Sequence, residues 1–209
     1  MTSSDFPQKR GRFIAFEGGD GSGKSTQAAR LADSLDAVLT REPGGTSIGS
    51  KIRELVLDPS HHELTSRTEA LLMAAARAQH VEERILPDLL EGRDVISDRF
   101  VASSLAYQGV GRGLGIEVIS ELNEFATNGL APDLTVLLDV DPDAARNRLG
   151  TELDRIEEAG ADLGRQVVET YRVLAAASPD RWVVVDANGD IDEVAERVRT
   201  AVADRLGSQ

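Results

Sequence analysis

The sequence contains no cysteine, which excludes disulfides, thiolate metal sites and cysteine nucleophiles. No apolar run approaches the length that spans a bilayer, and residues 1–12 lack the apolar centre of a secretory signal. Nothing in the composition therefore calls for an oxidising compartment or a membrane. We expect a cytoplasmic protein in which residues 1–11 form a flexible leader.

Positive charge is scarce as well. Lysine and arginine together number 23 against 36 aspartates and glutamates, which gives a formal net charge of −13 at pH 7. Such a chain lacks the basic surface that a nucleic-acid backbone requires, so nucleic acid is not expected as a partner. An anionic ligand would have to be held by a local group of arginines. The only lysines are Lys9, Lys24 and Lys51, so a lysine within a motif is informative.

The remaining composition is that of a globular protein, with 41% hydrophobic and 28% charged residues in a chain whose 209 residues suit a single domain. Short apolar runs alternate with long helical patterns, which is typical of a parallel sheet covered by helices. We expect strands at 13–17, 37–41, 94–98, 134–140 and 182–186. Helices are expected near 24–36, 46–57, 63–91, 115–129, 142–149, 160–177 and 190–206.

The first expected strand leads directly into Gly18-x-x-x-x-Gly23-Lys24-Ser25, the pattern of a phosphate-binding loop. Glycines allow the backbone N–H groups to surround phosphate oxygens at the start of a helix. Lys24 would reach the β- and γ-phosphates, and the Ser25 hydroxyl would complete the shell of a Mg²⁺ ion. A glycine-rich turn without a ligand is the alternative. The candidate ATP-binding residues are Gly18, Gly19, Asp20, Gly21, Ser22, Gly23, Lys24, Ser25 and Thr26.

The third expected strand ends in Asp98-Arg99, beside the place where this loop should lie. Asp98 could hold the Mg²⁺ hydration shell, and Arg99 could clamp phosphate through two hydrogen bonds. A surface ion pair is the alternative interpretation of this dipeptide. A GTPase is disfavoured because no asparagine begins an Asn-Lys-x-Asp motif. The pattern therefore favours a kinase or another ATP-binding protein.

Six segments, taken in their order along the chain, resemble the thymidylate kinase family. They are residues 17–26, Arg41-Glu42-Pro43-Gly44-Gly45-Thr46, Ala75-Ala76-Arg77, Asp98-Arg99-Phe100 with residues 103–109, Pro132-Asp133-Leu134, and Leu153-Asp154-Arg155-Ile156-Glu157. The resemblance implies a three-layer α/β/α fold of the phosphate-loop NTPase type, with a five-stranded parallel sheet in the order 2-3-1-4-5 and a short lid. It also implies a homodimer that phosphorylates dTMP with ATP and Mg²⁺ on the route to dTTP.

Carried over residue by residue, the resemblance implies roles for several side chains. Asp20 would contact the sugar 3′-hydroxyl, Arg77 and Gln108 would contact thymine, and Tyr107 would disfavour a 2′-hydroxyl. A surface arginine with a covered stem is the alternative for Arg77. At Met73 the chain departs from the family, which commonly has a phenylalanine there. The candidate substrate-binding residues are Asp20, Arg41, Pro43, Met73, Arg77, Arg99, Ser103, Ser104, Tyr107 and Gln108, and the candidate metal-binding residues are Ser25 and Asp98.

The lid is expected at about residues 145–158. Family members carry a basic residue either in the phosphate loop or in the lid, and here residues 19–22 contain none. The resemblance therefore points to a lid arginine, with Arg148 and Arg155 as candidates and the choice between them open. The expected catalytic residues are Lys24, Asp20, Arg99, Arg148 and Arg155. Two other functions remain: a related kinase for another deoxynucleotide or deoxynucleoside, and a nucleotide-binding regulator without turnover.

Overall fold

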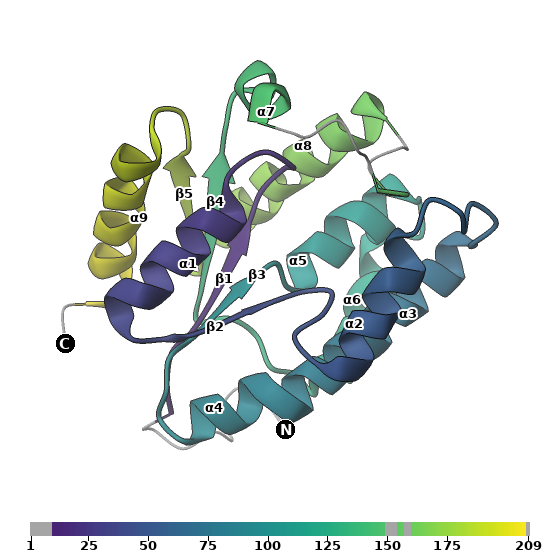
Figure 1. The fold of residues 1–209 in the computed structure, drawn as a ribbon, viewed down its shortest axis with the longest axis horizontal. Coiled ribbons are helices and arrows are strands. Elements are labelled where there is room, and N and C mark those ends of the chain that lie inside the picture. The colour runs from purple at the N-terminus through teal and green to yellow at the C-terminus, as the bar shows by residue number, and fades with distance from the viewer. Residues whose placement is uncertain (1–9, 149–153, 157–159, 208–209) are drawn as a thin grey trace.

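The computed structural model describes residues 10–148, 154–156 and 160–207 (Figure 1). Its centre is a five-stranded parallel sheet with the strand order β2-β3-β1-β4-β5, which confirms the expected order. The strands are β1 (Phe13–Glu17), β2 (Val38–Arg41), β3 (Val95–Asp98), β4 (Leu134–Asp139) and β5 (Trp182–Asp186). None of the described helices is long and apolar enough to cross a membrane.

Helices cover both faces of the sheet and give a three-layer α/β/α architecture (Figure 1). The α-helices are α1 (Lys24–Leu35), α2 (Ser47–Leu57), α3 (Ser66–His80), α4 (Leu86–Leu90), α5 (Val101–Ser104), α6 (Ile116–Thr127), α7 (Pro142–Arg148), α8 (Ala161–Ala177) and α9 (Ile191–Leu206). Two π-helical segments, η1 (Val81–Ile85) and η2 (Leu105–Gly111), continue α3 and α5.

Three expectations differ from this structure. The helix expected at 63–91 begins at Ser66 and is divided by the π-helical turn η1 before α4 ends at Leu90. The helical segment α5–η2 was not expected, because its serines and glycines have low helix propensity and tertiary packing decides its conformation. The leader expected at 1–11 does not include its last two residues: Gly11 is buried, and Arg10 forms an ion pair with Asp133 at 2.7 Å. Residues 1–9 lie outside the described part of the chain.

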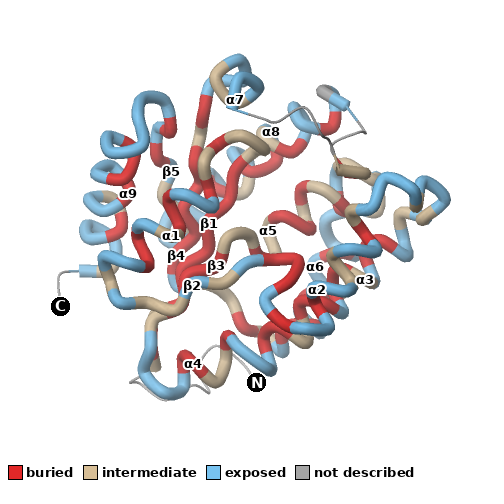
Figure 2. Tube along the Cα trace, viewed as in Figure 1, coloured by how far each residue is buried: buried red, intermediate tan, exposed pale blue. Residues whose placement is uncertain are grey.

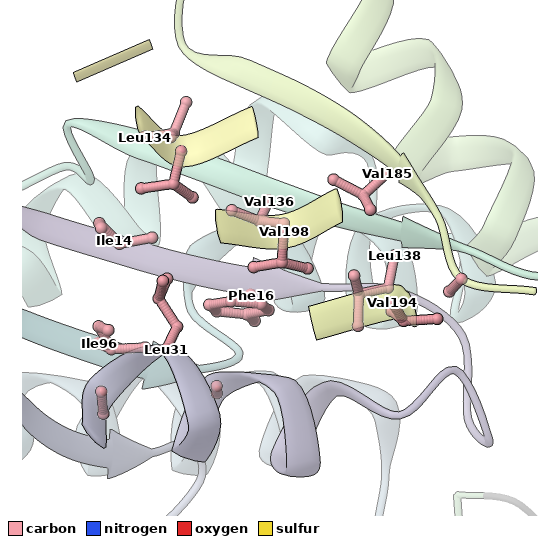
Figure 3. Packing of buried hydrophobic residues seen from close by; sticks show 14 of the residues in the cluster. Ile14, Phe16, Leu31, Ile96, Leu134, Val136, Leu138, Val185, Val194 and Val198 are labelled. Atoms are coloured by element: carbon pink, nitrogen blue, oxygen red, sulfur yellow. The ribbon is translucent and has the colours of Figure 1, made fainter. Parts of the chain in front are cut away.

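Alternation along β1 supplies apolar side chains to both layers. Ile14 and Phe16 pack with α1 and α9, whereas Phe13 and Ala15 pack with η1 and α4 on the opposite face. Figure 3 shows the first of these cores, in which Phe16 lies among side chains from β4, β5 and α9. The central strands β1, β3 and β4 run through the most buried part of the molecule, whereas the edge strands β2 and β5 are partly exposed (Figure 2). A rigid base of this kind holds the strand ends in fixed positions.

Strand register brings the expected site residues together. Asp98 is paired with Phe16 of β1 on one side and with Arg41 of β2 on the other. Because the strands are parallel, the segments that follow β1, β2 and β3 all leave the same edge of the sheet. The phosphate loop, the Arg41 segment and the Asp98-Arg99 pair therefore converge there.

Removing a side chain from the core beneath this edge should destabilise the fold. Leu138 is 1% exposed. Its replacement by alanine should lower the free energy of unfolding by about 2 to 5 kcal/mol, because a cavity remains in the core. Leu90 is 51% exposed, and its replacement by alanine should change the free energy by no more than about 0.5 kcal/mol. Urea denaturation measures both variants. Equal losses in the two variants would contradict the assigned core.

Candidate functional site

A cavity of about 400 Å³ opens at the carboxyl edge of the sheet. Most of the expected site residues line it: Asp20, Gly21, Gly23, Lys24, Ser25, Thr26, Arg41, Pro43, Met73, Asp98, Arg99, Ser103, Tyr107, Gln108 and Arg148. Six expected residues, all within the described part of the chain, do not line it: Gly18, Gly19, Ser22, Arg77, Ser104 and Arg155. One cavity thus joins the phosphate loop to the expected base-binding end.

The phosphate loop has the backbone that its glycines predict. Gly21 and Gly23 adopt positive φ angles of 78° and 89°, a region that side chains with a Cβ atom rarely enter. At Gly21 a Cβ atom would also lie 2.2 Å from the carbonyl oxygen of Ala145 in α7. The loop thus packs against the first part of the expected lid. Any larger residue at this position would push the two apart.

Lys24 is almost fully buried at the end of this loop. It is 6% exposed, and its Nζ donates a hydrogen bond to the Gly19 carbonyl at 2.7 Å and lies 4.0 Å from the Asp20 carboxylate. Burial and the neighbouring charge of Arg99 lower the pKa of Lys24 to about 8. An anion bound in the loop would stabilise the charged ammonium, so the side chain is suited to phosphate binding.

Ser25 and Asp98 meet at the edge of the cavity. The Ser25 hydroxyl donates to Asp98 Oδ2 at 2.5 Å, and Asp98 Oδ1 is buried without a hydrogen-bond partner among the described residues. An orphaned carboxylate oxygen beside a hydroxyl fits Mg²⁺, which commonly takes one or two carboxylates and completes its shell with water and substrate phosphates. No group of three or more histidines, cysteines or carboxylates that could form an all-protein metal site occurs in the described ranges.

Asp20, Arg99 and Tyr107 form one charged cluster. The Asp20 carboxylate accepts hydrogen bonds from the Arg99 guanidinium and from the Tyr107 hydroxyl, the latter at 2.9 Å. Burial would raise the pKa of Asp20, but the charges of Arg99 and Lys24 outweigh it and hold the pKa below its ordinary value. The Arg99 guanidinium also lies 5.3 Å from the centre of the Tyr107 ring. The three side chains therefore orient one another.

The backbone of Arg99 is itself in an unusual conformation. Its φ angle is +71°, which costs a residue with a Cβ atom about 1 kcal/mol or more. Two hydrogen bonds hold it, from Arg99 N to the Phe16 carbonyl at 2.9 Å and from Ser97 Oγ to the Arg99 carbonyl at 2.7 Å. The strand end thus turns Arg99 toward the phosphate loop.

Arg53 is a site residue that the sequence analysis missed. It lines the cavity together with Arg41 and Arg99, and its Nη1 donates to the Pro43 carbonyl at 3.0 Å. Burial and the charge of Arg41 lower the pKa of Arg53. Its spacing from Gly49 and Val56 could have revealed it, because both are buried and lie on the same face of α2. Counting Arg148, four arginines therefore line one cavity, which suits an anionic ligand.

Glu17 is a second residue that was missed as a functional group. Its buried carboxylate accepts hydrogen bonds from the Phe100 N–H at 2.9 Å and from the Ser103 hydroxyl at 2.7 Å, next to Arg99. Burial raises the pKa of Glu17, although the charge of Arg99 opposes this. A carboxylate at the end of an otherwise apolar strand was the available signal. The Glu17 carboxylate fixes the start of α5 behind the cavity.

Arg77 lies in a buried network beside the cavity. Its Nε donates to Glu42 at 2.6 Å, and its terminal nitrogens donate to Ser104, Asn123 and the Phe100 carbonyl. Glu42 supplies the acidic partner that a buried guanidinium requires, so charge burial alone does not demand a ligand here. Contact between Arg77 and a base stays a prediction, and so does the expected role of Ser104.

The far end of the cavity has few charges. Met73, which is 7% exposed, and Gln108, which is fully buried, line it. Gln108 Nε2 donates to Glu69 at 2.9 Å, whereas Gln108 Oε1 is buried with no hydrogen-bond partner in the described structure. A cavity lined by a thioether side chain and by a glutamine with an unused amide oxygen suits a flat apolar group that carries one N–H donor.

The two expected lid arginines lie in different places. Arg148 lines the cavity, and its guanidinium donates to the Ala187 carbonyl at 3.2 Å. Arg155 is held elsewhere, by the Glu69 carboxylate at 2.6 Å and the Val56 carbonyl at 2.7 Å. Of the expected lid, residues 149–153 and 157–159 lie outside the described residues.

Known proteins resemble this chain over most of its length. The sequence model of the thymidylate kinase family matches residues 16–198. A thymidylate kinase of Lactobacillus helveticus is 46% identical over 94% of this chain and 98% of its own length. One from Symbiobacterium thermophilum is 49% identical over 93% and 94%. The crystal structure of a thymidylate kinase from Ehrlichia chaffeensis superposes with a TM-score of 0.77 at 31% identity, covering 92% of this chain and 99% of that one.

The lowered pKa of Lys24 predicts opposite effects of pH on binding and stability. Affinity of the free protein for ATP should fall as pH rises through about 8, because neutral Lys24 no longer attracts phosphate. The folded state binds this proton less tightly than the unfolded state, in which the pKa of lysine has its ordinary value of 10.5. The contribution of Lys24 to the free energy of unfolding should therefore rise with pH between about pH 8 and pH 10.5. Calorimetric titration and urea denaturation at several pH values measure the two effects.

The control is Lys24→Met, which has no proton to lose at this position. Its ATP affinity should be low throughout, and its stability should lack the rise seen in the parent protein over the same pH range. An identical pH dependence of stability in both proteins would show that another group titrates there.

Proposed function

The chain belongs to the thymidylate kinase family, and we propose that it transfers the γ-phosphoryl group of ATP to dTMP, forming ADP and dTDP, in the cavity at the carboxyl edge of the sheet. The observation that carries this proposal is the continuity of the cavity, which Lys24 and Gln108 both line. A phosphate donor at one end and a nucleotide base at the other can occupy it together. Arg99 lines the same cavity and would contact the phosphates of both substrates.

The donor side uses the phosphate loop. Backbone N–H groups and Lys24 would bind the β- and γ-phosphates of ATP. Ser25 and Asp98 would hold Mg²⁺, which supplies further positive charge to these phosphates when it is bound. The chain itself contributes the positions of these groups, which the strand register sets.

The acceptor side uses the arginines. Arg41, Arg53 and Arg99 would bind the phosphate of dTMP, whose second pKa is about 6, so that the attacking oxygen is already ionised at neutral pH. No side chain therefore has to remove a proton from it. Catalysis then consists of holding the two phosphates in line and neutralising the charge that spreads over the transferred group.

Sugar and base would be recognised at the far end. Asp20 would accept a hydrogen bond from the 3′-hydroxyl, and the Tyr107 ring would occupy the space that a 2′-hydroxyl needs. Gln108 Oε1, the unused acceptor, would receive the N3–H of thymine, and Met73 would give apolar contact to the ring. Arg77 would contact the base from its buried network.

Arg148 is the lid arginine that we propose for catalysis, because it already lines the cavity. We also propose a homodimer in the cytoplasm. Exposed apolar side chains on two neighbouring helices support the dimer: Leu71 of α3 is 59% exposed, and Val118 and Phe125 of α6 are 60% and 87% exposed. Burying them between two subunits would remove apolar surface from water.

A panel of nucleoside monophosphates with ATP and Mg²⁺ tests the function. dTMP should have the highest kcat/KM, measured as ADP release. dUMP should be weaker but detectable, because the missing methyl group is worth about 1 to 3 kcal/mol in an apolar pocket. A preference for dCMP or dGMP would reject the thymidylate assignment while leaving a kinase, and no ADP release with any acceptor would favour a nucleotide-binding regulator.

Tyr107 should control discrimination against ribose. Replacing Tyr107 with alanine should narrow the difference in kcat/KM between dTMP and its ribonucleotide counterpart, because the steric barrier is removed. Tyr107→Phe is the matched control, since it keeps the ring and removes only the hydroxyl that contacts Asp20. That variant should keep the discrimination even if its rate falls. An unchanged ratio in Tyr107→Ala would assign ribose exclusion to another residue.

A further inference from the structure

A glutamine amide can meet a ligand in two orientations. Rotating the group by half a turn exchanges its oxygen, an acceptor, with its NH₂ group, a donor. A freely rotating Gln108 could therefore pair with the N3–H of thymine or, equally, with the unprotonated N3 of cytosine. Contact with Gln108 alone would not distinguish the two bases.

In this structure one hydrogen bond fixes the orientation of the Gln108 amide. Its Nε2 donates to Glu69 Oε1 at 2.9 Å, which leaves Oε1 as the atom without a partner in the described structure, in a residue that lines the cavity. An ionised carboxylate accepts hydrogen bonds and donates none. Rotating the amide would place its oxygen against the carboxylate, so that orientation is disfavoured.

Several contacts keep Glu69 charged and in place. It is 1% exposed, and it forms ion pairs with Arg155 at 2.6 Å and with Arg112 at 3.1 Å. Burial would raise its pKa, but the hydrogen bonds from Gln108, Arg155 and Arg112 outweigh this and lower it, so the carboxylate is ionised at neutral pH. Glu69 also lies one turn before Met73 on α3, on the face that meets the cavity.

We propose that Glu69 is a positioning residue for base specificity, which holds the Gln108 amide with its oxygen toward the base and so makes the cavity select a pyrimidine that carries N3–H. This inference rests on the proposed function of the cavity. Thymine and uracil satisfy the fixed acceptor. Cytosine would set the lone pair of its N3 against the Gln108 oxygen and leave both without a hydrogen bond.

The test is the ratio of kcat/KM for dTMP to kcat/KM for dCMP in the Glu69→Gln variant. A glutamine at this position can both donate and accept, so the two amides can rotate together and Gln108 can present its NH₂ group to cytosine. The ratio should fall by about tenfold or more, since a buried group left without a partner carries a penalty of that size. The fall should come partly from a gain in turnover of dCMP, which a general loss of structure would not produce.

Two controls separate positioning from a merely structural role. Arg112→Ala removes the more distant cation from Glu69 but leaves the ion pair with Arg155 and the hydrogen bond to Gln108, and should leave the ratio unchanged. In a Gln108→Ala background, Glu69→Gln should have no further effect on the ratio, because the amide that Glu69 orients is gone. A further fall in that background would overturn the proposal.

If Glu69→Gln does not fold, the double variant Glu69→Gln with Arg155→Met replaces the carboxylate together with the buried cation that it would leave unpaired. Any effect of Arg155 on the rate applies to both acceptors and cancels in the ratio. An unchanged ratio, with both substrates slowed equally, overturns the proposal. Turnover of dTMP by the parent protein is the separate criterion for the proposed function, and its absence would reject that function and this inference together.

Discussion

Burial of Lys24 beside Arg99 is the constraint on which the rest of the site depends. Two neighbouring cations shielded from water repel each other, and the lowered pKa of Lys24 reflects that repulsion along with its burial. The carboxylates of Asp20, Asp98 and Glu17 offset part of it. Phosphate groups would offset the rest, so the same charges that are unfavourable in the free protein become favourable with substrate bound. The net charge of −13 therefore coexists with a local site for anions.

Three buried glutamates organise this site from behind. Glu17 holds the start of α5 next to Arg99, Glu42 pairs with Arg77 and accepts a hydrogen bond from His80 Nδ1 at 2.9 Å, and Glu69 holds Gln108. Removing one member of a buried charged pair typically costs about 3 to 5 kcal/mol, because the other member stays buried without a partner. Each glutamate thus ties the geometry of the cavity to the stability of the fold. Substitutions behind the cavity will therefore alter stability and recognition together.

The sequence predicted the elements and residues that have local signals. Strand positions follow from apolar runs, and the phosphate loop follows from its glycines, Lys24 and Ser25; the strand order came only with the family resemblance. Helix α5–η2 was missed because its serines and glycines have low helix propensity and interrupt the helical pattern. The role of Glu69 is set by a partner far away in the chain, since 39 residues separate it from Gln108. No local pattern encodes such a contact.

The two expected lid arginines, Arg148 and Arg155, differ in the free energy needed to release each from its present partners. Arg155 would have to leave a buried carboxylate, Glu69, to reach a phosphate, and breaking such a pair leaves an uncompensated charge inside the protein. Arg148 is held only by carbonyl oxygens that follow β5, and hydrogen bonds from a charged group to such acceptors contribute about 1.5 to 3 kcal/mol each. Exchanging these neutral acceptors for a phosphate leaves no buried charge unpaired, so Arg148 can move at a lower cost than Arg155. Glu69 would meanwhile hold Arg155, and with it residues 154–156, against α2 and α3 when a nucleotide is bound.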